Sequence, residues 1–231
     1  MAFPRLETQA GPLEDGDCLS SKEFLRRLEA LPGAPEIELV EGIVRLGPAA
    51  NSQARAKPRS LVVSWLQAYT AVTPGTSVTA NQIVLLDREN IGQPDATLRI
   101  LSEYGGRTRV SERNYLLGAP ELIVEILLTR GIQDLRNKLA ALRRNGVQEY
   151  VVWRLQEAQV EWFQLEKGGY VANLPDPNSL LRSSTFPGLT LNVSALLSHE
   201  LAALRKTLDS ATHQPRHAAF VERLLRRKRG A

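Results

Sequence analysis

The most strongly apolar stretch of the chain is "ELIVEILL" at residues 121–128. Short continuous apolar runs of this kind are typical of strands that are covered on both faces of a sheet. Residues 132–146 follow with leucines at helical spacing and end in a glycine, which predicts a helix. The pattern therefore predicts a central strand followed by a helix.

Similar patterns mark the other elements. Ser20, three residues before Glu23, forms a capping box that opens a helix ending near Pro32. The remaining expected elements are a hairpin at 36–46, a helix at 60–72, strands near 77–86 and 96–101, a second hairpin formed by 147–155 and 158–167, and a closing segment at 183–197. This order predicts one α/β domain with a central mixed sheet flanked by helices. We expect a loose segment at 1–18, the domain at 19–198 and a basic, helix-prone tail at 199–231.

Glu125 breaks the apolar pattern of the central run. In a strand it shares one face with Ile123 and Leu127, so it is expected to be partly buried and therefore paired, protonated or metal-bound. Lys138 lies on the core-facing side of the next helix and is its natural partner. Spacing alone leaves a structural ion pair open, and Lys138 could instead pair with Asp134, four residues earlier.

A second acidic residue stands at the start of a predicted strand. In "GQPDATLRI" (92–100), Asp95 directly precedes the apolar positions. Asp is common in turns and poor in strands, so Asp95 could simply end a loop. The alternative is that Asp95 is one of several acidic groups that face a metal ion.

The distribution of charged residues and histidines limits which kinds of active site the domain can form. Residues 199–231 hold eight basic and three acidic side chains, a net of +5, whereas residues 1–198 hold 21 basic and 22 acidic ones, a net of −1. The high isoelectric point therefore belongs to the tail and does not by itself indicate a nucleic-acid-binding core. All three histidines also lie in the tail, which argues against a core histidine triad or a histidine-ligated zinc.

Cysteine content and hydropathy set the expected compartment. The single cysteine, Cys18, excludes an internal disulfide and a multi-cysteine zinc site. No apolar run is long enough to cross a bilayer, and the N-terminus lacks the layout of a secretory signal. We therefore expect a cytoplasmic protein without a membrane partner, whose chemistry uses carboxylates, lysine and a hard metal such as magnesium or manganese.

Five ordered motifs resemble a known family. They are "IELVEGIV", "QPDATL", "GAPELIVEILL", "DLRNKLAALRRNGVQEYVVW" and "FPGLTL", and together they cover about residues 20–198. In this order they resemble the Uma-two family of restriction-endonuclease-type proteins, a branch of the PD-(D/E)XK nuclease superfamily. The resemblance implies a restriction endonuclease-like fold and a metal-dependent endonuclease that hydrolyses phosphodiester bonds, with DNA as its substrate.

The resemblance also assigns roles to individual residues. Asp95 and Glu125 match the acids that bind magnesium, or manganese in its place, and Lys138 matches the catalytic lysine, which here comes from the helix after Glu125. Glu38 matches an acid ahead of the first hairpin turn, and Asp134 matches the acid one helical turn before the lysine. A homodimer is expected, because cleavage of two strands needs two active sites.

Some positions depart from the family pattern. The chain has "LLTRG" after the second acid, "NSQARAKPRS" where members often open the second helix with histidine, and "WRLQEAQ" in place of an Asp-Pro turn. A catalytically degenerate member that acts as a nucleic-acid- or protein-binding module therefore stays open, as does a structural domain with a Glu125–Lys138 ion pair. The clusters Arg55, Lys57, Arg59 and Arg107, Arg109, Arg113 fit either phosphate contacts or solvated surface, as does the basic run 226–229.

Overall fold

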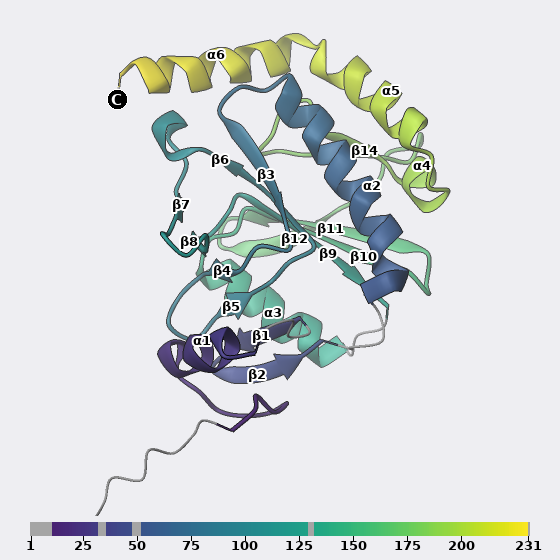
Figure 1. The fold of residues 1–231 in the computed structure, drawn as a ribbon. Helices are drawn as coiled ribbons and strands as arrows, with labels where there is room; N and C mark the ends of the chain where they lie inside the picture. The colour runs from purple at the N-terminus through teal and green to yellow at the C-terminus, as the bar shows by residue number, and fades with distance from the viewer. Residues whose placement is uncertain (1–10, 32–35, 48–51, 129–131, 231) are drawn as a thin grey trace, which may run out of the picture.

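Two six-stranded mixed sheets and six helices build the described part of the chain, which covers residues 11–31, 36–47, 52–128 and 132–230 of the computed structural model (Figure 1). The larger sheet has the order β12-β11-β10-β9-β6-β3 and the smaller one β2-β1-β5-β4-β8-β7. This arrangement confirms the predicted α/β class, although the strands divide into two sheets. Within the described ranges, no helix combines the length and apolar character needed to cross a membrane.

The larger sheet contains the predicted central strand. Its strands are β3 (Thr76–Ala80), β6 (Ala96–Ile100), β9 (Leu122–Leu127), β10 (Glu149–Arg154), β11 (Gln159–Glu166) and β12 (Gly169–Asn173). Strand β9 pairs in parallel with β10 and antiparallel with β6, so it lies inside the sheet. All six of its residues are buried, as the apolar run predicted.

The smaller sheet contains the first predicted hairpin, which is formed by its first two strands. Its strands are β1 (Ile37–Val40), β2 (Ile43–Leu46), β4 (Val84–Leu85), β5 (Ile91–Gly92), β7 (Arg109–Val110) and β8 (Leu116–Leu117). Glu41 and Gly42 form the hairpin turn, both with positive φ. A two-stranded sheet of β13 (Leu180–Arg182) and β14 (Thr190–Asn192) completes the strands of the described segments.

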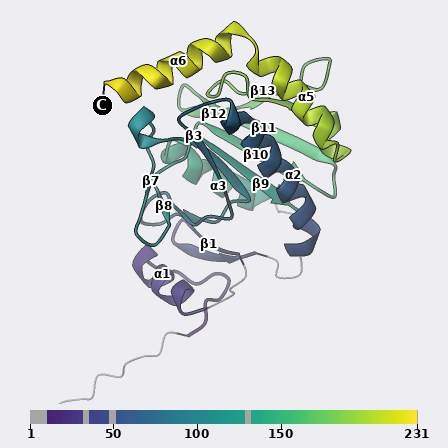
Figure 2. The same ribbon diagram turned by 45° about the horizontal axis from the view of Figure 1, so that its top comes forward.

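Most of the helices cover the two faces of the larger sheet, and the first packs on the smaller sheet. Their bounds are α1 (Ser21–Glu29), α2 (Ser52–Ala71), α3 (Ile132–Arg144), α4 (Val193–Leu197), α5 (Leu201–Thr212) and α6 (Pro215–Arg229), with a 3-10 turn at Ser102–Tyr104. Helix α3 packs on one face, and α2, α5 and α6 lie over the other (Figures 1 and 2). The side-chain oxygen of Ser20 accepts a hydrogen bond from the Glu23 N–H at 3.3 Å, which confirms the predicted start of α1.

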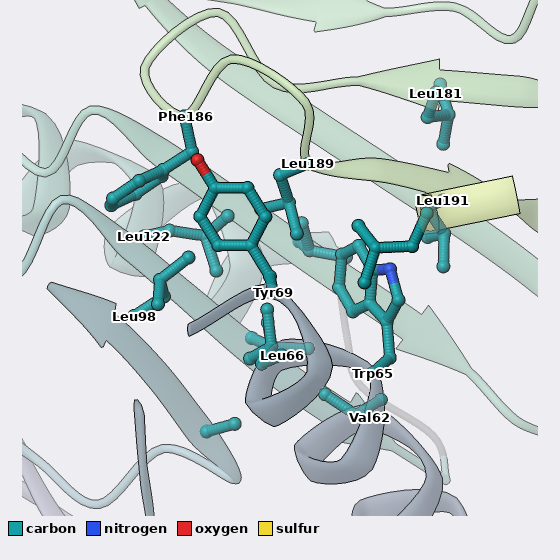
Figure 3. Packing of buried hydrophobic residues seen from close by; sticks show 14 of the residues in the cluster. Val62, Trp65, Leu66, Tyr69, Leu98, Leu122, Leu181, Phe186, Leu189 and Leu191 are labelled. Atoms are coloured by element: carbon teal, nitrogen blue, oxygen red, sulfur yellow. The ribbon is translucent and has the colours of Figure 1, made fainter. Parts of the chain in front are cut away.

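The main apolar core lies between the larger sheet and α2 (Figure 3). Trp65 is fully buried there, packs edge-on against Trp162 and donates its indole N–H to the Thr190 carbonyl at 3.0 Å. Leu204 of α5 and Leu224 of α6 belong to the same core. The basic C-terminal helices are therefore packed on the domain rather than projecting from it.

The helix predicted at 60–72 begins earlier than expected, at Ser52. Pro58 lies inside this helix, although proline cannot donate the helical hydrogen bond and disturbs the turn before it. The structure continues the helix through Pro58, and ion pairs from Arg55 and Arg59 to acidic residues of neighbouring segments hold the early turns in place. This extra length brings both arginines to the site described next.

Candidate active site

Four of the five residues that the sequence singled out line one cavity of about 550 Å³. They are Glu38 of β1, Asp95 at the start of β6, Glu125 of β9 and Lys138 of α3. Each is at most 7 % exposed. The fifth, Asp134, belongs to α3, but its side chain lies outside the described residues. Groups separated by up to 100 positions in the chain therefore converge on one place.

Strand pairing brings the two candidate metal ligands together. Ala96 of β6 lies opposite Val124 of β9, so the next position along each strand places Asp95 opposite Glu125. Directly opposite residues of an antiparallel pair project on the same face with their Cβ atoms about 5 Å apart. The backbone N–H of Ile126 also donates to Asp95 Oδ2 at 2.7 Å, which fixes that carboxylate at the cavity wall.

Lys138 lies between Glu38 and Glu125 and pairs with both carboxylates. Its Nζ donates to both Glu38 oxygens at 2.7 Å and forms an ion pair with Glu125 Oε1. The hydroxyl of Tyr150 donates to Glu125 Oε2 at 2.7 Å. The Glu125–Lys138 pairing expected from the sequence is therefore present, and the buried charges are compensated as buried charges must be.

The opening turns of α2 contribute two arginines to the same acidic cluster. Arg59 donates from Nε to Asp95 Oδ1 at 2.7 Å, and its second guanidinium nitrogen lies 2.6 Å from the same oxygen. Arg55 lies at 3.6 Å from Asp95 Oδ2, and both arginines pair with Glu36 just before β1. Asp95 is therefore held by a backbone N–H and two guanidinium groups.

Burial and neighbouring charges have opposite effects on the pKa values of Asp95 and Arg59. Burial raises the pKa of the Asp95 carboxyl above its ordinary value, and the Ile126 N–H, Arg59 and Arg55 offset only part of that rise. Burial also disfavours the charged guanidinium of Arg59, but Asp95 and Glu36 outweigh it, so the pKa of Arg59 is raised. Protons and cations thus compete for Asp95.

Sequence reasoning missed how three side chains take part. It weighed Arg55 and Arg59 only as phosphate contacts or solvated surface, and it assigned Tyr150 no role at the site. Four-residue spacing places the two arginines on one helix face, but that signal depends on a helix running through Pro58. No pattern in the sequence indicates that Arg55 and Arg59 form ion pairs with Asp95.

The other basic candidates lie elsewhere. Arg107 donates to the Gly146 carbonyl at 2.7 Å, and Arg113 pairs with Glu29 of α1. The run 226–229 lies at the end of α6, where Lys228 packs over the Tyr104 ring. Among the described residues that line the cavity, none comes from these clusters.

The donor set is suited in kind to a hard divalent ion. Asp95 and Glu125 offer carboxylate oxygens, which magnesium and manganese prefer. Four carboxylates (Glu36, Glu38, Asp95, Glu125) and three basic groups (Arg55, Arg59, Lys138), counted as ionised, give the cluster a net charge of −1.

Asp95 and Glu125 already pair with basic side chains, Asp95 with Arg59 and Glu125 with Lys138. No three acidic, histidine or cysteine side chains within the described ranges converge as a ready metal cage. The site therefore fits an ion held by two carboxylates that competes with Arg59 and Lys138, and not a preformed multi-carboxylate cage.

Comparisons with known proteins identify the family and the fold. A crystal structure described as a "putative nuclease belonging to DUF820" from Anabaena variabilis superposes with a TM-score of 0.56 and 16 % identity, over 82 % of this chain and 99 % of that one. No curated protein matches the chain. A family profile named Uma2, described as "Putative restriction endonuclease", matches residues 22–194. The chain therefore belongs to the Uma2 family and shares the fold of that nuclease-like neighbour.

Proposed function

We propose that the protein is a metal-dependent DNA endonuclease, as its family membership suggests in general terms. The observation that supports this most is the convergence of Asp95, Glu125 and Lys138 on one cavity, from two paired strands and a helix. Two carboxylates that can hold a metal ion and a nearby lysine are groups that metal-assisted phosphodiester hydrolysis can use.

Each residue has a distinct role in this proposal. Asp95 and Glu125 would hold magnesium or manganese, which supplies Lewis-acid polarisation of the phosphodiester and activation of water. Lys138 places a positive charge at the cavity, where it stabilises negative charge that develops on the phosphate. Glu38 orients Lys138 through two hydrogen bonds, and Asp134 is proposed to assist from the same helix.

The charge balance supports a phosphodiester substrate. A divalent ion would change the net charge of the cluster from −1 to +1, and one phosphodiester would bring it to neutrality. Arg55 adds a fixed positive charge at the cavity wall, which favours a phosphate there. A homodimer is part of the proposal, since it supplies the second active site needed for two-strand cleavage.

One observation favours a second candidate, a nucleic-acid-binding module without turnover. Asp95 is already neutralised by Arg59 and Arg55, so the arginines could replace the ion permanently. Such a module would bind duplex DNA with a strong dependence on salt but would not cut it.

A cleavage assay with supercoiled plasmid DNA separates the endonuclease from the binding module. An RNA of matched length tests whether DNA is the substrate. We expect nicked or linear DNA with magnesium or manganese and none with a chelator. Asp95→Asn keeps the acceptor for the Ile126 N–H but should abolish cleavage, whereas Asp176→Asn, at an exposed pair with Arg182, should not. Binding of DNA without metal-dependent cleavage would favour the binding module, and full activity of Asp95→Asn would exclude the assigned site.

A further inference from the structure

Arg59 holds the carboxylate to which the proposed ion must bind. Two of its nitrogens lie 2.6 and 2.7 Å from Asp95 Oδ1, while Oδ2 receives the Ile126 N–H. Both oxygens of Asp95 are therefore already engaged. Because hydrogen bonds to a charged group are stronger than those between neutral groups, an ion arriving at Asp95 has to displace a substantial interaction.

Glu36 keeps the displaced guanidinium at the cavity. It pairs with Arg59 as well as with Arg55, and it lines the same cavity as Asp95. Arg59 does not itself line the cavity, but it can release Asp95 and stay beside the cavity through its pair with Glu36. Its planar guanidinium presents several N–H donors in a fork that matches a phosphate as well as a carboxylate.

Arg55 adds a second donor at this wall. The residue is only 9 % exposed, and its buried Nε has no hydrogen-bond acceptor among the described residues. An unsatisfied buried donor of this kind is unfavourable and is normally met by a ligand or another polar group. Both arginines therefore suit an anionic oxygen brought into the cavity.

We propose that Arg59 exchanges partners during function: it neutralises Asp95 in the free protein and binds a phosphate of the nucleic acid once a divalent ion takes Asp95. This inference rests on the proposed function, since it assumes that the cavity takes up an ion and a phosphodiester. It assigns Arg59 two opposite effects, weakening ion binding and strengthening nucleic-acid binding. A merely structural ion pair would not produce both.

The first measurement is the affinity for Mn²⁺ alone, from the electron paramagnetic resonance signal of the free ion at pH 8. Arg59→Gln should bind Mn²⁺ about tenfold more tightly, because the competing charge is gone. Arg182→Gln is the matched control, since Arg182 is exposed, pairs with Asp176 and does not line the cavity, and it should change the affinity less than about threefold. Arg59→Lys should restore weak binding, because the positive charge returns.

The second measurement is the affinity for a fluorescein-labelled 20-base-pair duplex in Ca²⁺, followed by fluorescence anisotropy. Arg59→Gln should bind the duplex about tenfold more weakly than the unchanged protein, because a charged phosphate contact is lost. Circular dichroism spectra of the variants check that each is folded. Unchanged or weaker Mn²⁺ binding by a folded Arg59→Gln overturns the proposal, as does unchanged duplex binding.

These outcomes are separable from a failure of the nuclease proposal. If the protein does not cleave DNA but Arg59→Gln shifts both affinities as stated, the partner exchange holds and the endonuclease assignment fails. If the protein cleaves DNA with magnesium and Arg59→Gln leaves the Mn²⁺ affinity unchanged, the endonuclease assignment holds and the exchange fails. Absence of Mn²⁺ binding in every form overturns the exchange.

Discussion

Lys138→Met removes the one buried cation that contacts both Glu38 and Glu125 in the described structure. Lys138 is 6 % exposed, and its Nζ donates to both Glu38 oxygens at 2.7 Å. Methionine has a stem of similar length, so the substitution removes charge with little loss of packing. Two carboxylates that are 7 % and 3 % exposed then lack their lysine.

The expected loss in the free energy of unfolding follows from this geometry. Breaking a buried ion pair by removing one partner typically costs about 3–5 kcal/mol. The remaining carboxylates can escape that cost only by binding a proton. For a glutamate in water this costs about 5 kcal/mol at pH 8 but about 1 kcal/mol at pH 5. The loss should therefore fall from about 3–5 kcal/mol at pH 8 to about 1–2 kcal/mol at pH 5.

Urea unfolding at the two pH values, followed by circular dichroism, measures this difference. Lys206→Met, at an exposed position of α5, is the matched control and should change stability by less than about 0.5 kcal/mol at either pH. A loss below about 1 kcal/mol at pH 8 would refute the buried-cation reasoning. An equal loss at both pH values would show instead that packing, not charge, determines the effect.

Two further predictions concern the core. Trp65→Ala should destabilise the protein by about 3–5 kcal/mol in urea unfolding, since it opens a cavity beside Trp162 and leaves the Thr190 carbonyl without its indole donor; a loss under about 1 kcal/mol would contradict this packing. Burial lowers the pKa of His217, which is hydrogen-bonded to Thr73 at 2.9 Å, so the unfolded chain binds a proton more readily than the folded one. The stability that His217 contributes should be present above pH 6.5 and decline as the pH falls toward the lowered pKa, and thermal unfolding of His217→Gln should show a smaller decline over the same range if this sign is right.

Local sequence signals predicted most of the elements. The apolar run at 121–128 became the buried strand β9, and the leucine pattern that follows became α3. These predictions succeed because strand burial and helix periodicity depend on near neighbours in the chain. The predicted start of α2 was wrong because the helix-spaced apolar residues begin only near Leu61, whereas ion pairs to Glu36 and Asp95 that form only in the folded chain hold the polar turns before it.

The apolar pattern singled out Glu125 but did not show how its role would differ from that of other buried carboxylates. Glu121 accepts the Ile100 N–H at 2.9 Å, and Glu149 is fully buried among hydroxyl and backbone donors of residues 183–185. Both are structural, although they belong to strand segments much like that of Glu125. Only the family resemblance assigned Glu125 a different role beforehand.

The sequence by itself determined the α/β class, the central strand, the helix after it and, through the ordered family motifs, the acids and the lysine of the candidate site. The tertiary structure decided what surrounds them. The strand register places Asp95 opposite Glu125. Lys138 pairs with Glu38 as well as with Glu125, and Arg59 pairs with Asp95. These pairings join segments far apart in the chain, so packing and charge compensation select them, and no local pattern encodes them.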